Sequence, residues 1–414
     1  MDIYRLIDVL RSGKDSSFQD EIRGKKDFSI NEITRLRKKY PDLPAGDLIS
    51  LHKLRLRAEK KFSNADKFIF TDKSLQQATP EPAAEYHALK LKDYPRKADL
   101  CCGAGMDLIA MCDGKNKVTA VDLDPEILEI AKYNAKVRNI KNITFKCQKA
   151  EEFADKVDAV FCDPDRRIGN KRKIRPEDLS PNLYDLLKIS KYNKNIMIKL
   201  SPAMNYSVIK TDVGFGLEFV SSGGELKEIL LTLGSLKDKA RKKAVIISSE
   251  GNISYLRSND PGFKSVSEPG KYLYEPDPAV IRAGLIEQDA FKYKLNFINE
   301  NIALLTSDFY REDMTGTWYR TEEQFPYNLR NLKKKLKEEK IGDLTVKTRG
   351  FHMTVEDLRK KLKPEGKNKK TIFIVRTGKS FEVFVIRRID KQKHLNCVFQ
   401  PEINRNENLK NRRR

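Results

Sequence analysis

Two glycines after a short apolar run predict a loop that holds a nucleotide-like ligand. Residues 98–100 read Ala-Asp-Leu, and Gly103 and Gly105 follow just before a helical pattern begins. Glycine reaches turn conformations closed to other residues, so backbone N–H groups of such a loop can face a ligand where a helix starts. Asp122 ends the next apolar run, where a carboxylate suits a ribose diol. Together these residues predict a nucleotide-cofactor site.

A third apolar run ends in Phe-Cys-Asp-Pro-Asp-Arg at residues 161–166. Open α/β sheets bind ligands outside the carboxyl ends of their strands, so this segment should meet the other two in one crevice. Bulkier residues stand where a dinucleotide site needs its third glycine. The pattern therefore argues against a dinucleotide cofactor.

The elements that must position these segments alternate between helices and strands. Helical periodicity covers residues 83–91 and 126–138. Strand patterns occur at residues 99, 118, 143–147, 159–161 and 196–200, with two late strands at 229–233 and 243–249. Alternation of this kind implies parallel strands covered by helices. Because the two late strands are close together in the sequence, we expect the sheet to end in antiparallel strands.

The charge balance favours a polyanionic partner. The 414 residues include 81 Lys plus Arg against 59 Asp plus Glu, a formal net charge of +22. Such an excess favours nucleic acid, through phosphate contacts and counterion release. The alternative is a lysine-rich chain whose lysines simply lie on solvated faces.

The cysteines and histidines predict no disulfide framework and no metal. The six cysteines form no Cys-x-x-Cys pair and have no histidine at zinc-like spacing, which is typical of thiols in a reducing compartment. The four histidines stand apart in the sequence. No apolar stretch approaches the length of a membrane span, so we expect a soluble, cytoplasmic protein.

The sequence resembles the class I S-adenosylmethionine-dependent methyltransferases, in residues 99–105, Asp122 and residues 163–166. It resembles more closely the bacterial methyltransferases that carry a THUMP-like C-terminal domain. That resemblance rests on residues 61–71, 77–79, 99–107, 199–202, 271–284 and 348–350. Residues 78–86 also look like the segment before the cofactor loop in trimethylguanosine synthases, which have Ser-Pro-Pro-Trp where Asp-Pro-Asp-Arg stands here.

The resemblance implies a fold class, a division into domains and a set of site residues. The fold class is α/β, with a Rossmann-like class I methyltransferase sheet, an N-terminal helical region and small C-terminal α+β modules. The implied divisions are an N-terminal helical region (1–80), the methyltransferase domain (81–266), a small ferredoxin-like connecting module (267–320), a THUMP-like domain (321–395) and a basic tail (396–414). The implied residues for S-adenosylmethionine are Thr79, Asp99, Cys101, Gly103, Gly105, Asp107, Asp122, Leu123, Glu151 and Asp163.

The fourth-strand motif, Asp163, Pro164, Asp165 and Arg166, is the predicted catalytic segment. A methyl sulfonium is already electrophilic, so the enzyme mainly has to align a nucleophile and desolvate it. Asp163 could accept a hydrogen bond from an amine and take up a proton late in the reaction. Pro164 would fix the turn, and Arg166 could clamp a phosphate or stack on a base. The alternative is a capped strand end with Asp163 and Arg166 as a surface ion pair.

A similar Asp-Pro-x-Arg motif occurs in the uridine C5 methyltransferases, which use a covalent cysteine. Cys162 adjoins Asp163, but neighbours on a strand face opposite ways and cannot both point at one substrate. Nitrogen or oxygen methylation is therefore preferred over a thiol adduct. Tyr206 and Trp318 could supply a stacking face for a base, although a core or rim position is the favoured interpretation of each.

The basic C-terminal module is the predicted RNA-binding module, because the THUMP-like resemblance implies tRNA or other RNA binding. Its basic residues are Lys333, Lys334, Lys335, Lys337, Lys340, Lys347 and Arg349. We expect a methyltransferase that acts on a base nitrogen of structured RNA, with tRNA or rRNA as partner and no metal. The alternative is a methyltransferase for a small molecule or a protein, with the C-terminal module as a lid or oligomerisation element.

Overall fold

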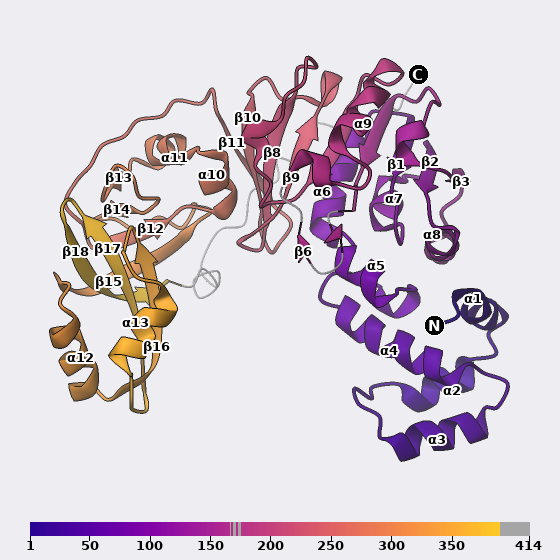
Figure 1. The fold of residues 1–414 in the computed structure, drawn as a ribbon, viewed down its shortest axis with the longest axis horizontal. Helices are drawn as coiled ribbons and strands as arrows, with labels where there is room; N and C mark the ends of the chain where they lie inside the picture. The colour runs from indigo at the N-terminus through magenta and orange to yellow at the C-terminus, as the bar shows by residue number, and fades with distance from the viewer. Residues whose placement is uncertain (166, 169–170, 173–174, 390–414) are drawn as a thin grey trace, which may run out of the picture. The chain divides into compact units, whose positions relative to one another are not determined.

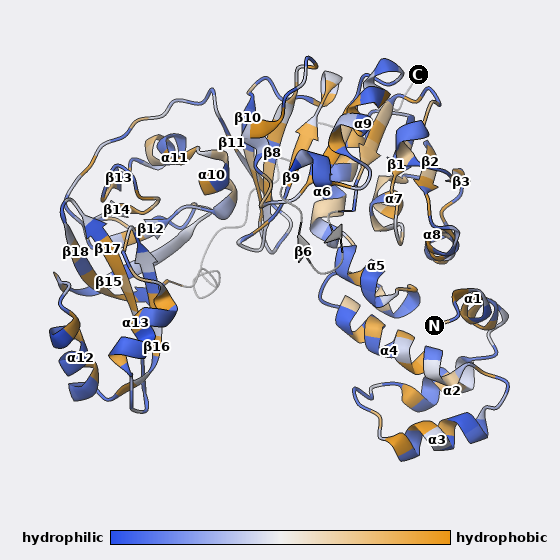
Figure 2. Ribbon diagram, in the orientation of Figure 1, coloured by the Kyte–Doolittle hydropathy of each residue, from blue (hydrophilic) through white to orange (hydrophobic). Residues whose placement is uncertain are grey.

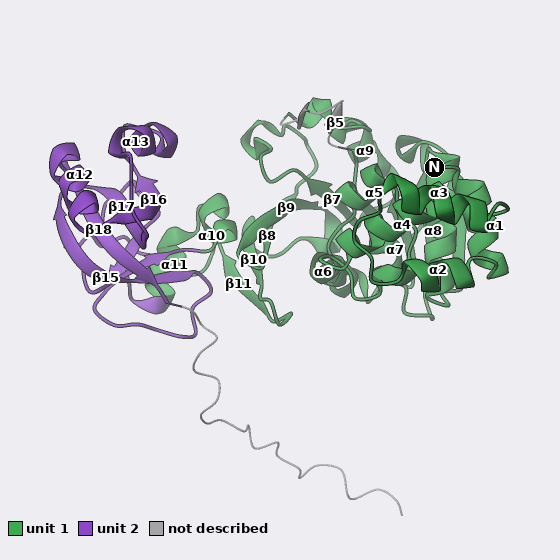
Figure 3. Ribbon diagram, turned by 90° about the horizontal axis from the view of Figure 1, so that it is seen from below, with its two compact units in different colours: residues 1–262, 277–292 green, residues 263–276, 293–414 purple. Residues whose placement is uncertain are grey.

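The structure is a computed structural model that describes residues 1–165, 167–168, 171–172 and 175–389. The chain forms two compact units. Unit 1 comprises residues 1–262 and 277–292, and unit 2 comprises residues 263–276 and those from 293 onward (Figure 3). The residues predicted as a basic tail, 396–414, lie outside the described residues, as does the end of the predicted THUMP-like domain after residue 389.

Unit 1 contains a nine-stranded sheet in the order β11-β10-β8-β9-β7-β4-β1-β2-β3 (Figure 1). The strands are β1 (Arg96–Leu100), β2 (Lys117–Asp122), β3 (Ile143–Cys147), β4 (Ala159–Cys162), β7 (Ile196–Leu200), β8 (Gly216–Ser222), β9 (Glu225–Thr232), β10 (Lys242–Ile247) and β11 (Ile253–Arg257). Five neighbouring strands of this sheet, β7, β4, β1, β2 and β3, run parallel to one another. The sheet confirms the predicted parallel α/β core.

Of the two late strands expected to be antiparallel, only the first, β9, has that direction relative to its neighbours in the parallel part of the sheet. β9 runs antiparallel to both β7 and β8. The second late strand, β10, pairs in parallel with β8, a strand that the sequence interpretation missed. β8 and β9 are joined by Gly223 and Gly224, both with positive φ, so the hairpin places β9 between β7 and β8.

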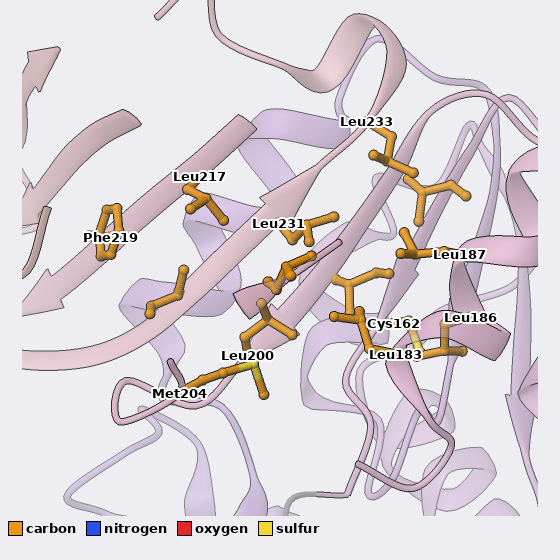
Figure 4. Close-up of a cluster of buried hydrophobic side chains, with 14 of the residues drawn as sticks. Cys162, Leu183, Leu186, Leu187, Leu200, Met204, Leu217, Phe219, Leu231 and Leu233 are labelled. Atoms are coloured by element: carbon orange, nitrogen blue, oxygen red, sulfur yellow. The ribbon is translucent and has the colours of Figure 1, made fainter. Parts of the chain in front are cut away.

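Helices cover both faces of this sheet. On one face, α9 (Leu183–Leu187) and α10 (Pro278–Ala283) pack on a core that includes Ile198. Figure 4 shows Leu183, Leu186 and Leu187 of α9 in this core together with Cys162 and Leu200. On the other face, α6 (Glu81–Leu91) and α7 (Met106–Met111) pack on Phe161 and Met197. α8 (Pro125–Val137) covers β2, and α11 (Ile286–Tyr293) follows α10. Orange, apolar residues run along the central strands in Figure 2.

The N-terminal region is helical, as the predicted fold class has it. Its helices are α1 (Ile3–Ser12), α2 (Ser16–Ile22), α3 (Ile30–Lys39), α4 (Ala45–Ala58) and α5 (Asp72–Gln77). Leu6 and Leu51 are fully buried in a cluster that also holds Met106 of α7 and Ile130 of α8. Because this core is shared, the N-terminal helices are part of unit 1.

Unit 2 contains a seven-stranded sheet in the order β13-β14-β12-β15-β18-β17-β16. Its strands are β12 (Tyr272–Glu275), β13 (Asn296–Phe297), β14 (Leu305–Ser307), β15 (Thr317–Pro326), β16 (Ile341–Arg349), β17 (Asn368–Thr377) and β18 (Ser380–Arg388). α12 (Leu329–Glu338) and α13 (Val355–Leu362) cover one face, and their leucines pack on Ile372 and Ile374. β15 pairs with both β12 and β18, so one sheet includes residues of both predicted C-terminal modules.

None of the helices in the described part of the chain has the length and apolar character that crossing a membrane requires.

Candidate functional site

A cavity of about 1000 Å³ in unit 1 opens where β1, β2, β4 and β7 end. It is lined by nearly all of the residues predicted to bind the cofactor: Thr79, Asp99, Cys101, Gly103, Asp107, Asp122, Leu123, Glu151 and Asp163. Pro164 and Asp165 of the predicted catalytic segment also line it. Gly105 does not line the cavity, and Arg166 lies outside the described residues.

The loop between β1 and α7 has the conformation that its glycines predict. Gly103 and Gly105 have φ values of 53° and 84°, in the left-handed region. A Cβ on Gly105 would lie 3.3 Å from Ala131 Cβ of α8, so a larger residue would be tightly packed as well as strained in its backbone. Gly105 therefore shapes the loop from behind rather than facing the cavity.

Asp122 is tied to this loop by backbone hydrogen bonds. Gly103 N–H donates to Asp122 Oδ2 at 3.0 Å, and Asp124 N–H donates to Oδ1 at 3.1 Å. Burial raises the pKa of Asp122, and the backbone donors oppose that rise. Leu123, at the same edge, is 64% exposed and presents an apolar surface to the cavity.

Asp99 is a buried carboxylate without a hydrogen-bond partner in the described chain. The residue is 1% exposed, and neither Oδ1 nor Oδ2 accepts a hydrogen bond. Burial, followed by the charges of Asp107 and Asp163, raises the pKa of Asp99 well above its ordinary value. Asp99 lines the cavity, and its carboxylate has no positively charged hydrogen-bond donor among the described residues. The arrangement fits a ligand that brings a positively charged N–H group.

Behind the cavity, His87 lies between two buried carboxylates. Its Nδ1 is 2.7 Å from Asp107 Oδ1, and its Nε2 is 2.5 Å from Glu228 Oε1. Burial alone lowers the pKa of His87, but the two carboxylates outweigh it and raise the pKa to about 10. His87 is therefore an imidazolium at neutral pH. No sequence pattern indicates this pairing, because His87 and Glu228 are far apart along the chain and Glu228 precedes the apolar half of β9.

Lys199, at the end of β7, joins this buried chain of polar groups to Asp163. Its Nζ donates to Asp163 Oδ2 and to Thr79 Oγ1, both at 2.6 Å. Thr79 Oγ1 donates in turn to Asp107 Oδ2 at 2.6 Å. Lys199 is buried, with 3% of its side chain exposed, and is not a solvated surface lysine. Asp163 pairs with this lysine from the neighbouring strand.

The neighbouring residue Asp165 is held by α5. Gln77 Nε2 donates to Asp165 Oδ1 at 2.9 Å, and Lys73 Nζ lies 3.5 Å from Asp165 Oδ2. Lys61, on the same side of the cavity, donates to the carbonyls of Leu75 and Ala78 near the end of α5. Burial, with repulsion from Lys199, lowers the pKa of Lys61 to about 8. The N-terminal helices thus supply part of the cavity wall.

The tract at residues 271–284 divides between the two units. In unit 1, Arg282 donates to the carbonyls of Pro202 and Met204, at 3.0 and 2.6 Å, and so fixes the loop after Lys199. In unit 2, Glu275 pairs with Lys347 and Arg349. The tract and the Thr-Arg-Gly motif at 348–350 therefore meet in an ion pair.

Three other sequence candidates are not among the residues that line the cavity. Tyr206 stacks under the Arg282 guanidinium at 5.1 Å, and Trp318 is buried among tyrosines of unit 2. Both have the core or rim positions that were favoured. Cys162 is 1% exposed and belongs to the core on the opposite face of the sheet from Asp163. Among the described residues, no group of three or more potential ligands is placed to hold a metal ion.

Comparisons with known proteins agree with the fold. Residues 98–172 match the family described as methyltransferase domain, and residues 316–388 match the family described as THUMP domain-like. A Mycobacterium tuberculosis protein named as an uncharacterized S-adenosylmethionine-dependent methyltransferase is 26% identical over 80% of this chain and 92% of its own length.

Two further matches bear on fold and relationship. The crystal structure of a candidate methyltransferase from Porphyromonas gingivalis is 20% identical, with a TM-score of 0.67 over 88% of this chain and 100% of that one. It shows the same fold. A tRNA/tmRNA (uracil-C(5))-methyltransferase of a Shewanella species is 28% identical over 31% of this chain and 34% of its own length. The predicted fold class and family resemblance are confirmed.

Proposed function

We propose that this chain, a class I S-adenosylmethionine-dependent methyltransferase with a C-terminal THUMP-like domain, methylates a base nitrogen of structured RNA. The observation that carries the proposal most is the position of Asp163, at the end of β4, in the cavity that also holds Asp99 and Asp122. One cavity thus has room for both a methyl donor and the group that receives the methyl.

The residues present fit S-adenosylmethionine. The unpartnered carboxylate of Asp99 suits the donor's ammonium group, since a buried anion is stabilised by a charged hydrogen-bond donor. Gly103 has no atom within 4 Å of where its Cβ would lie, so the loop can approach a ligand closely. Asp122 is placed to accept from ribose hydroxyls, with Leu123 and Glu151 beside it for the adenine. Thr79, Cys101 and Asp107 complete this half of the cavity.

Asp163 holds the nucleophile. S-adenosylmethionine supplies an electrophilic methyl group on a sulfonium. Asp163 accepts an N–H of the substrate amine, aims the nitrogen lone pair and receives the proton that the methylated nitrogen loses. Pro164 fixes the backbone after β4, and Asp165, anchored by Gln77, keeps this segment against α5. We further propose Arg166 as a contact to the base or its phosphate.

Nitrogen is a better target than pyrimidine carbon. The Shewanella relative acts on uracil C5, a reaction for which the sequence offered Cys162 as the thiol. Because Cys162 is buried in the core, its position argues against a covalent adduct between its thiol and the base. Cys101 lines the cavity, but it lies with Gly103 in the loop between β1 and α7, the donor loop, which is proposed to bind the methyl donor S-adenosylmethionine.

RNA is the proposed substrate class for three reasons. The THUMP-like match covers residues 316–388, the Shewanella relative acts on tRNA, and the chain has a net charge of +22. Lys333, Lys337 and Lys340 are exposed in unit 2 and form no ion pair with the described residues. Lys335, Lys347 and Arg349 instead pair with glutamates, which leaves a smaller basic surface than the sequence predicts.

The test is a comparison of modified nucleosides in total RNA from cells with and without the gene. We expect one N-methylated nucleoside to disappear in the deletion and to return with the wild-type gene. Asp163→Ala, made as a control, should not restore it. If every methylated nucleoside persists in the deletion strain, the RNA substrate is wrong, and the small-molecule or protein alternative takes its place.

A further inference from the structure

Lys199 is buried at the junction between the catalytic aspartate and the donor side of the cavity. Its ammonium contacts Asp163 Oδ2 and Thr79 Oγ1 at 2.6 Å and lies 3.8 Å from Glu228 Oε2. With 3% of the side chain exposed, it is not placed to contact an RNA phosphate.

The register of the sheet places Lys199 beside Asp163. In the parallel pair β4 and β7, Cys162 lies opposite Ile198, and both face the same apolar core. The next residues, Asp163 and Lys199, therefore point to the other face, where the cavity lies. The ion pair is a direct consequence of strand register and not of a flexible lysine reaching across solvent.

The contacts of Lys199 leave one oxygen of Asp163 available. A buried ammonium is stable only with charged or hydrogen-bonding partners, and Asp163 Oδ2 is one of them. Oδ1 forms no hydrogen bond with any residue that the structure describes. Asp163 is 19% exposed at its side chain, so Oδ1 can be reached from the cavity.

We propose that Lys199 is a positioning residue for methyl transfer. It fixes the carboxylate of Asp163 through Oδ2, so that Oδ1 accepts the N–H of the substrate amine. Through Thr79 and Asp107, it also fixes this carboxylate relative to the donor loop. The inference rests on the proposed function, because it assigns Lys199 an effect only through Asp163.

A double-mutant cycle tests this role in the full-length protein. Lys199→Met, Asp163→Asn and the double variant are compared with the wild type, using S-adenosylmethionine labelled in its methyl group. RNA, protein and small-molecule fractions from cells lacking the gene serve as separate acceptors. The initial rate is measured at saturating donor, and the donor Kd is measured by calorimetry.

We expect Lys199→Met to slow transfer by about 100-fold while the donor Kd changes by less than about threefold. Asp163→Asn should have a similar effect, and the double variant should be no slower than Asp163→Asn alone. Lys243→Met is the matched control, because Lys243 is a buried lysine of the same sheet, 2.7 Å from Glu218, that does not line the cavity. It should keep the wild-type rate at a temperature where it is folded.

Three results would overturn the inference: an unchanged rate in Lys199→Met, a multiplicative further loss in the double variant, or a loss explained by weaker donor binding. If Lys199→Met does not fold, the charge-balanced double variant is compared with Asp163→Asn, and a slower double variant contradicts the inference. Labelling of the protein or small-molecule fraction instead of RNA would refute the proposed RNA substrate alone. The same variants, measured on that acceptor, would then decide the role of Lys199.

Discussion

His87 Nε2 lies 2.5 Å from Glu228 Oε1, although the two residues are 141 positions apart in the chain. Asp107 Oδ1 binds the other ring nitrogen, so a protonated imidazole joins α6, α7 and β9 inside the fold. Burial opposes ionisation of Asp107 and Glu228, but His87 outweighs it and lowers the pKa of both. The wall of the cavity is therefore held together by charge as well as by packing.

This arrangement predicts a pH dependence of stability. The pKa of His87 in the folded protein, about 10, lies above the ordinary histidine value of 6.5, so its contribution to stability is complete below about pH 6.5 and is lost as pH rises toward 10. The lowered pKa values of Asp107 and Glu228 mean that their contribution is lost as pH falls in the acid range.

His87→Asn should destabilise the fold by about 3–5 kcal/mol at pH 6, because it removes the buried cation that Asp107 and Glu228 share. Chemical denaturation from pH 6 to 10 measures the difference from the wild type, which should shrink as pH rises. A difference that stays constant across this range would show that His87 does not fold as an imidazolium.

Asp99→Asn should stabilise the donor-free protein while it weakens donor binding. The raised pKa of Asp99 means that its ionisation opposes folding, so the gain in stability should grow as pH rises above the ordinary carboxyl range. Loss of the charged contact to an ammonium should weaken the donor by about 10-fold or more. Thermal unfolding with and without S-adenosylmethionine measures both effects. Asp158→Asn, at an exposed pair with Arg96, is the control and should show neither.

Arg282→Met should loosen the loop that follows Lys199. The guanidinium donates to the carbonyls of Pro202 and Met204, and Pro202 lines the cavity. Removing both bonds should cost about 2–3 kcal/mol and speed hydrogen exchange of the backbone amides of residues 203–205. Arg241→Met, at an exposed arginine of unit 1, is the control. Unchanged exchange in Arg282→Met would mean that the loop is fixed by its apolar contacts alone.

Much of the fold could be predicted from the sequence because its elements carry strong periodicity. Strands β3 and β7 have the predicted bounds, and Leu48, Leu51 and Leu54 are buried as their helical spacing indicates. The missed strand β8 begins at Gly216 and alternates poorly, since nearly all of it is buried. The Gly223-Gly224 turn was the signal for the hairpin, and attention to turn chemistry would have found it.

Only the part of the candidate site that lies in local sequence motifs could be predicted. The loop glycines, Asp122 and Asp163 follow strand ends, and strand ends of a parallel sheet converge. His87, Lys199 and Glu228 gave no such signal, because their roles depend on pairings across the sheet. Such pairings follow from register and burial, which a single sequence does not specify.

RNA binding should depend steeply on salt, and part of that dependence should come from unit 2. If Lys333, Lys337 and Lys340 contact phosphates, changing all three to Gln should reduce the slope of log affinity against log salt by about 2–3. The control is Lys335→Gln, because Lys335 is already paired with Glu323 at 2.6 Å and Glu339 at 3.2 Å. Removal of residues 391–414 separates this surface from the basic terminal segment. Filter binding of total tRNA at several salt concentrations measures each slope. If the truncated chain no longer retains RNA while the triple variant binds like the wild type, these three exposed lysines are solvated residues and do not bind RNA.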